Sequence, residues 1–167
     1  WPEDVGGCSP GQFNVNVSAN YLRHFSTSKA PDTPFVDYAG TTGDSAFSGG
    51  LLDPQFRWKT TTTVGYALGP WSASVRWRHL PSIRSATSAT ALPPGAYNQV
   101  DVSARWAVTK TYEVRAGVDN LFDVDPLVTG ATPAVGTTFA STGAGTTYSS
   151  VYDVLGRRFY VGLKARF

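Results

Sequence analysis

The chain has 167 residues, of which only 16% are Asp, Glu, Lys or Arg, whereas soluble domains average roughly 25%. The 17 glycines and the aromatic content of 13% favour strands and turns over a helical bundle, and the net charge of +2 is too small to indicate a nucleic-acid-binding protein. No stretch reaches the roughly 18 consecutive apolar residues of a membrane-spanning helix. This excludes spanning helices only, because transmembrane strands alternate apolar and polar residues and contain no such run.

Alternation of apolar and polar residues recurs in six segments and predicts six β-strands. The last segment shows it best, because Phe159, Val161, Leu163 and Ala165 alternate with polar residues or glycine up to the terminal Phe167. We expect residues 1–167 to form one all-β unit of antiparallel strands in sequential order. The predicted strands lie near residues 12–29, 55–68, 71–80, 97–108, 112–122 and 151–167.

The connections between these strands alternate in length. Gly69-Pro70 and Thr109-Lys110-Thr111 leave room only for tight turns. Short and long connections therefore lie at opposite ends of the predicted sheet, as in outer-membrane barrels. We expect low order at 130–150, where Gly, Ala, Thr and Ser dominate. The long connections span 30–54, 81–96 and 123–150.

The two predicted faces of the sheet differ in chemistry. Alternation alone also fits a half-buried soluble sheet, but aromatic residues toward strand ends and a single isoleucine, Ile83, favour a membrane-facing surface. The apolar face carries the aromatic residues Trp58, Trp71, Trp77, Trp106, Tyr112, Phe159 and Phe167. The polar face carries nine basic and three acidic residues, namely Arg57, Lys59, Arg76, Arg78, Arg105, Arg115, Arg158, Lys164, Arg166, Asp101, Glu113 and Asp119.

Two interpretations of the charged face stay open. The basic excess would attract an anionic solute such as a ferric siderophore. Alternatively, the charges pair with one another, with a missing domain or with water. Glu113 and Arg115 are predicted to share a face with Asp101 and Arg105 on the adjoining strand, so cross-strand pairs are available.

Two motifs near the carboxyl end resemble the last strands of TonB-dependent receptors. The first is Asn120-Leu121-Phe122-Asp123, and the second opens with Tyr152-Asp153 and continues through Gly156-Arg157 into the last strand. In that family an N-L-F-D segment closes the penultimate strand, and a Y-D-x-x-G-R-x-[FY] run opens a final strand with an aromatic end. The VDYAG run at 36–40 and Trp77-Arg78 are weaker points of similarity.

This resemblance implies the carboxyl-terminal part of a barrel of about 22 strands in the bacterial outer membrane, plugged by an amino-terminal domain. Such receptors take up siderophores, cobalamin or other scarce nutrients with energy relayed through TonB. Six strands are fewer than the roughly eight of the smallest single-chain barrels, so we expect an open curved sheet. The implied partners are outer-membrane lipid, the remaining barrel and plug, and TonB acting through the plug. Because the chain begins at Trp1, contains no Met and shows no plug or TonB box, we interpret it as a piece of a longer receptor.

The last strand also resembles the signal by which the barrel-assembly machinery recognises outer-membrane proteins. An extended strand that presents alternate apolar side chains suits pairing with an exposed sheet edge. The residues of this predicted signal are Phe159, Val161, Leu163, Ala165 and Phe167.

No group of residues predicts catalysis, a cofactor or a metal site. His24 and His79 have no neighbouring Ser or Cys nucleophile in the predicted sheet. Asp119, Asp123 and Asp125 lack the glycine and the distal glutamate of a calcium loop, so we interpret them as part of a strand-end turn. We therefore expect a protein that is not an enzyme. Two alternatives to the receptor remain, a porin-like barrel assembled from several chains and a secreted β-sandwich binding or adhesin module.

Overall fold

The computed structural model describes residues 11–28, 30–42, 54–85, 95–127, 147 and 151–166. The predicted low-order segment 130–150 lies outside these residues apart from Thr147, as do Cys8 and Phe167. Among the described residues, no helix is long and apolar enough to cross a membrane.

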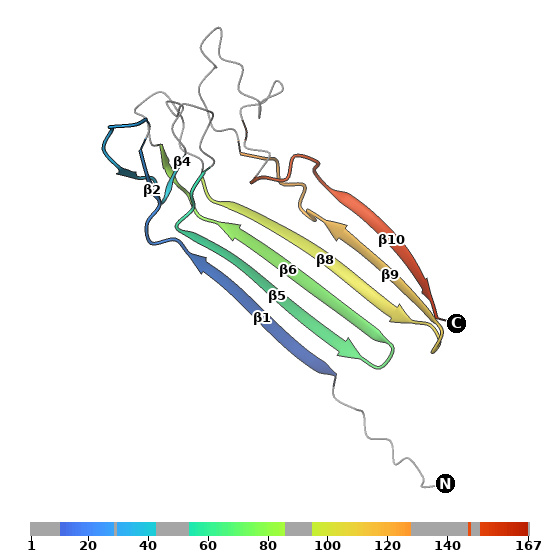
Figure 1. Cartoon of the computed structure of the whole chain (residues 1–167). Helices are drawn as coiled ribbons and strands as arrows, with labels where there is room; N and C mark the ends of the chain where they lie inside the picture. The colour runs from blue at the N-terminus through green and yellow to red at the C-terminus, as the bar shows by residue number, and fades with distance from the viewer. Residues whose placement is uncertain are drawn as a thin grey trace, which may run out of the picture.

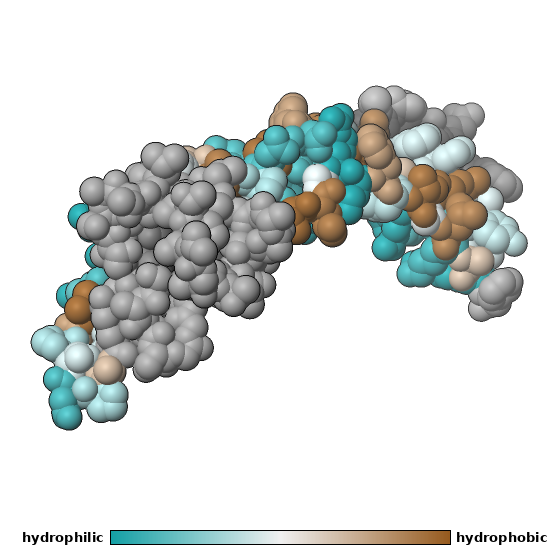
Figure 2. All heavy atoms as spheres, turned by 90° about the horizontal axis from the view of Figure 1, so that it is seen from above, coloured by the Kyte–Doolittle hydropathy of each residue, from teal (hydrophilic) through white to brown (hydrophobic). Residues whose placement is uncertain are grey.

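Six long strands form one antiparallel sheet in sequential order, so the predicted meander is confirmed (Figure 1). The described part of the chain does not close into a barrel, and from above it follows an open arc (Figure 2). The strands are β1 (Gln12–Tyr21), β5 (Trp58–Leu68), β6 (Trp71–Leu80), β8 (Tyr97–Ala107), β9 (Tyr112–Asp119) and β10 (Arg158–Ala165).

The register confirms the predicted faces. Val15 pairs with Val64, Val64 with Val75, and Val75 with Val102, so one row of apolar residues crosses four strands on one face. The row continues through Val118 to Phe159. Arg105 pairs with Arg115 and lies on the opposite face from Val102, as the alternation predicts.

The short and the long connections lie at opposite ends of the sheet, as expected. Gly69, with φ of +54°, allows Leu68 and Trp71 to pair across a two-residue turn. The long connections lie at the other end, where one short pairing lies within the first connection and another joins the first connection to the second (Figure 1). These are β2 (Ser26–Thr27) with β3 (Val36–Asp37), and β4 (Thr41–Thr42) with β7 (Arg84–Ser85).

Several strands are shorter than the alternation predicts. The first leaves the sheet after Tyr21, and β9 ends before Asn120, whose φ of +54° is incompatible with a strand. The last strand begins only at Arg158, because Gly156 has a φ of +70° just before it. Phe56, which lies within the predicted strand 55–68, instead precedes β5 and is buried in a cluster among the long connections.

The buried apolar residues lie among the long connections and at the adjoining end of β8. Phe56, Ile83, Tyr97 and Tyr152 form one cluster, with Leu80, Val124, Leu127 and Val151 packed against it. Each of the three long connections contributes to this cluster, which therefore joins their bases into one packed unit.

Candidate functional site

The apolar face of the sheet is its most exposed surface. Leu163 is 83% exposed, Val161 77% and Phe159 75%, and apolar residues of the other long strands are exposed as well. Soluble proteins rarely expose apolar patches of this extent, because water contact with them is unfavourable. This face therefore requires an apolar neighbour.

Aromatic pairs lie at both ends of the apolar face. Trp71 and Trp106 stack with ring centroids 4.7 Å apart at the short-connection end. Tyr21 and Trp58 lie 4.4 Å apart at the end of the long connections. Two aromatic levels that flank an apolar band are the arrangement of transmembrane barrels, where rings sit at the two membrane interfaces.

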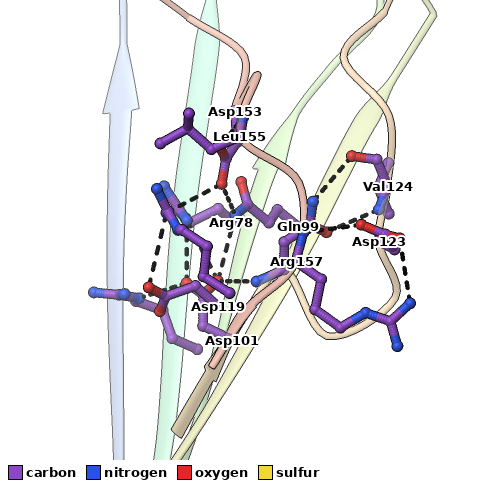
Figure 3. A network of polar contacts seen from close by, with 12 residues as sticks. Arg78, Gln99, Asp101, Asp119, Asp123, Val124, Asp153, Leu155 and Arg157 are labelled. Atoms are coloured by element: carbon purple, nitrogen blue, oxygen red, sulfur yellow. Dashed lines mark hydrogen bonds and ion pairs between the residues drawn. The ribbon is translucent and has the colours of Figure 1, made fainter. Parts of the chain in front are cut away.

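Asp101 is the centre of a network on the polar face. It is nearly buried, and its carboxylate accepts hydrogen bonds from Arg76 Nε at 3.0 Å and from Arg78 at 3.1 Å (Figure 3). Its Oδ1 also accepts the backbone N–H of Asn120 at 3.0 Å. A buried carboxylate is stable only when charge and hydrogen bonds compensate its lost hydration, and here two guanidinium groups and a backbone donor do so.

The first family motif forms a corner on this network. Asn120 is fully buried, its Nδ2 donates to Val124 O at 3.0 Å, and its Oδ1 accepts the Val124 N–H at 2.9 Å. Leu121 N–H donates to Val100 O, which fixes the corner on β8. Phe122 points away and is 68% exposed. Asparagine suits the corner because it tolerates a left-handed backbone and closes a side-chain turn.

The second motif packs against the first. Asp123 Oδ1 accepts the Arg157 N–H at 2.8 Å, and the Arg157 guanidinium lies 3.3 Å from Asp123 Oδ2 (Figure 3). A Cβ at Gly156 would lie 3.1 Å from the same carboxylate, in a backbone region that L-residues rarely adopt. Two hydrogen bonds from Arg157 hold the pKa of Asp123 below its usual value. The bond from the backbone N–H has the larger effect and the bond from the side chain the smaller one.

Tyr152 and Asp153 complete the contact between the motifs and the sheet. The Tyr152 ring lies edge-on to Tyr97, with centroids 5.0 Å apart. Asp153 accepts from Gln99 Nε2 at 3.0 Å and lies 3.3 Å from Arg158. All eight predicted motif residues thus lie in one corner, although Leu121 and Phe122 make no polar side-chain contact there.

Sequence reasoning missed the roles of Gln99 and Asp37. Gln99 is almost fully buried and bridges Asp101 and Asp153, and its only signal was its place on the polar face of a predicted strand. Asp37 accepts the backbone N–H groups of Phe25 and Ala39 and a bond from His24, which together lower its pKa to about 2. Its position in the VDYAG run was the available signal.

Of the two interpretations of the charged face, pairing of its charges with one another applies to the three acidic residues. Asp101 pairs with Arg76 and Arg78, Glu113 with Arg105 and Arg115, and Asp119 lies 3.7 Å from Arg158. Arg57, predicted on the same face, instead lies before β5 and contacts Asp37 and the Arg23 carbonyl. Basic residues still outnumber acidic ones on this face.

The predicted assembly residues Phe159, Val161, Leu163 and Ala165 share the apolar face of β10. Within the described part of the chain, β10 pairs only with β9, so its other edge is open. Phe167 lies outside the described residues.

A family model described as TonB dependent receptor-like, beta-barrel, matches residues 8–121. No curated protein and no solved structure matches the chain. The match ends at Leu121, so the described corner residues at 122–127 and 151–158 lie beyond it. The matched residues cover most of the chain and include five of the six long strands, and the chain therefore belongs to the TonB-dependent receptor β-barrel family of the outer membrane.

Proposed function

We propose that the chain forms part of an outer-membrane receptor for TonB-dependent uptake of siderophores or other scarce nutrients. The observation that carries this proposal is the register, which places an exposed apolar surface with aromatic ends on one face and the basic residues on the other. The apolar face would contact membrane lipid, and the polar face would line the lumen. The open edges of β1 and β10 would pair with the rest of the barrel.

Energy dependence separates this proposal from a porin-like barrel. The test measures uptake of radioactive iron, supplied as hydroxamate and catecholate siderophores, and of labelled cobalamin by cells that produce the full protein. We expect uptake of at least one ligand that disappears when TonB is deleted. Uptake that persists without TonB would instead indicate passive diffusion and contradict the proposal.

We also propose that the last strand is the signal for the barrel-assembly machinery. The alternate apolar residues of β10 and its open edge suit recognition by strand pairing. Phe167→Ala should lower the amount of folded protein in the outer membrane, whereas Phe159→Ala, another aromatic residue of the predicted signal, should lower it less. Heat-modifiable migration in gels measures the folded fraction, and equal assembly of the two variants would limit the role of Phe167 to packing.

A further inference from the structure

A polar cluster interrupts the apolar face of the sheet near its long-connection end. Trp77 and His79 of β6 share this face with Val75, and Asn98 of β8 joins them because it pairs with His79. Both strands are central in the sheet, so the cluster lies away from the open edges of β1 and β10 and on the opposite side from the charged face. In the receptor proposed above, neither the remaining strands nor a plug would therefore cover it.

The hydrogen bonds of the cluster fix how its groups are oriented. Trp77 Nε1 lies 3.0 Å from the side-chain amide of Asn98, and because an indole N–H only donates, the atom it meets is the oxygen Oδ1. His79 Nδ1 lies 2.8 Å from the same oxygen, which has no proton to give, so Nδ1 carries the hydrogen. The neutral imidazole then presents Nε2 as an acceptor, and Asn98 presents its amide N–H groups as donors.

These remaining groups call for one kind of ligand. Among the described residues, neither Asn98 Nδ2 nor His79 Nε2 has a hydrogen-bond partner, and Asn98 is exposed. Thr60 of β5, which pairs with His79, brings a hydroxyl to the same row. A ligand hydroxyl both donates and accepts, so it satisfies the amide and the imidazole together, whereas a fully ionised phosphate would set only acceptors against the Nε2 lone pair. The cluster therefore suits a molecule with several hydroxyl groups.

The cluster lies where an amphipathic molecule would have its headgroup. The Tyr21–Trp58 pair at this end of the apolar face marks the membrane interface. Val75 is exposed and begins the apolar band toward the middle of the sheet. Trp77 is exposed as well, with its ring centroid 5.7 Å from that of His79, and offers apolar surface beside the polar groups. Hydroxyl groups at the cluster and acyl chains along the band would thus occupy one continuous surface.

We propose that this cluster binds the sugar headgroup of a glycolipid. The sugar hydroxyls accept from Asn98 and donate to His79 Nε2, and the C–H face of the sugar ring packs against Trp77. The acyl chains cover the exposed apolar band below. This assignment rests on the proposed function in one respect, that the apolar face contacts lipid, and does not depend on nutrient uptake.

The test measures retained lipid by native mass spectrometry of the full protein in an amine-oxide detergent, which has no sugar headgroup. Separate samples contain galactosyl diacylglycerol or phosphatidylcholine with the same acyl chains, and we expect preferential retention of the galactolipid. Asn98→Ala should weaken this retention about tenfold, because the donors are lost and Trp77 and His79 lose the oxygen that orients them. Asn14→Ala, the matched control on the polar face of β1, should leave it unchanged.

A second readout uses the unaltered protein, in which the galactolipid should shift the side-chain amide NMR signals of Asn98 and leave those of Asn14 in place. Equal retention of the two lipids, or full retention by folded Asn98→Ala, would overturn the proposal. Displacement of the lipid by an equal concentration of free galactose would overturn its assignment to a glycolipid. Loss of TonB-dependent uptake with lipid selectivity retained would contradict only the proposed function, and the reverse result only this site.

Discussion

At the end of the long connections, Phe56, Ile83, Tyr97 and Tyr152 pack into a buried cluster, and Asp101 and Asn120 form a hydrogen-bonded corner beside it. At the opposite end, two tight turns close the strands, and basic residues surround an open cavity. The first end is stabilised mainly by contacts within the chain. The second, like the apolar face, leaves most of its side chains exposed.

This difference predicts where substitutions destabilise the protein itself. At the long-connection end, the loss of one buried group should lower the free energy of unfolding. On the apolar face, the same loss should mainly affect contact with lipid.

The largest effect is expected for Tyr152→Ala. Tyr152 is 2% exposed and packs against Tyr97, so its removal leaves a cavity in the cluster. The free energy of unfolding, measured by urea titration of the protein in lipid vesicles, should fall by about 3 kcal/mol. Leu155→Ala is the matched control in the same segment, because Leu155 is 68% exposed, and an equal loss for both would contradict the cluster's role.

Asn120→Ala should cost about 2–3 kcal/mol, because it leaves Val124 without its side-chain partner and places alanine at a φ of +54°. Asn120→Gly removes the same hydrogen bonds but tolerates this backbone. Unfolding titrations should therefore place glycine between asparagine and alanine. If Asn120→Ala is instead more stable than Asn120→Gly, the left-handed backbone at this position does not determine the stability of the corner.

A smaller effect is expected at Gly117, where Tyr160 lies across the glycine on the polar face. A Cβ there would overlap the Tyr160 hydroxyl oxygen, so the ring must move. Gly117→Ala should destabilise by about 1 kcal/mol. Gly162→Ala on the paired strand has nothing within 4 Å of the new Cβ and should be neutral or stabilising. Equal unfolding free energies for the two variants would contradict this packing.

The smallest effect is a local one at low pH. Since the pKa of Asp37 is lowered to about 2 from 3.8, its contribution to the folding of 25–39 is complete above about pH 4. It is lost as the pH falls through 2, when the carboxylate is protonated. Carboxyl carbon NMR should show a titration midpoint near 2 for Asp37 in the folded protein. A midpoint near 3.8 would show that its backbone hydrogen bonds are not formed.

The central strands were predictable because their residues alternate strictly and pair in register. Trp71, Ala73, Val75 and Trp77 alone indicate the start and the exposed face of β6, since the side-chain period of a strand is two. The two motifs could be recognised for the same local reason, because each is continuous in the sequence.

The rest depends on contacts between distant segments. Phe56 continues the alternation of β5 in sequence, but its burial depends on Ile83 and Tyr152, which come from other connections. The early end of β9 likewise follows from Asn120, whose backbone N–H donates a hydrogen bond to Asp101 on β8. Alternation reports only the local period, so it does not reveal where tertiary contacts draw a strand end out of the sheet.

The central claim is that the odd-numbered residues of β10 face lipid and the even-numbered ones face water. Spin labels placed singly at 159–165 in a Cys8→Ser background, in the full protein reconstituted in bilayers, would test it through collision rates with oxygen and with a water-soluble nickel complex. We predict oxygen maxima at 159, 161, 163 and 165 and nickel maxima at 160, 162 and 164. Equal nickel accessibility at both sets of positions, or the opposite alternation, would contradict the assignment of the two faces.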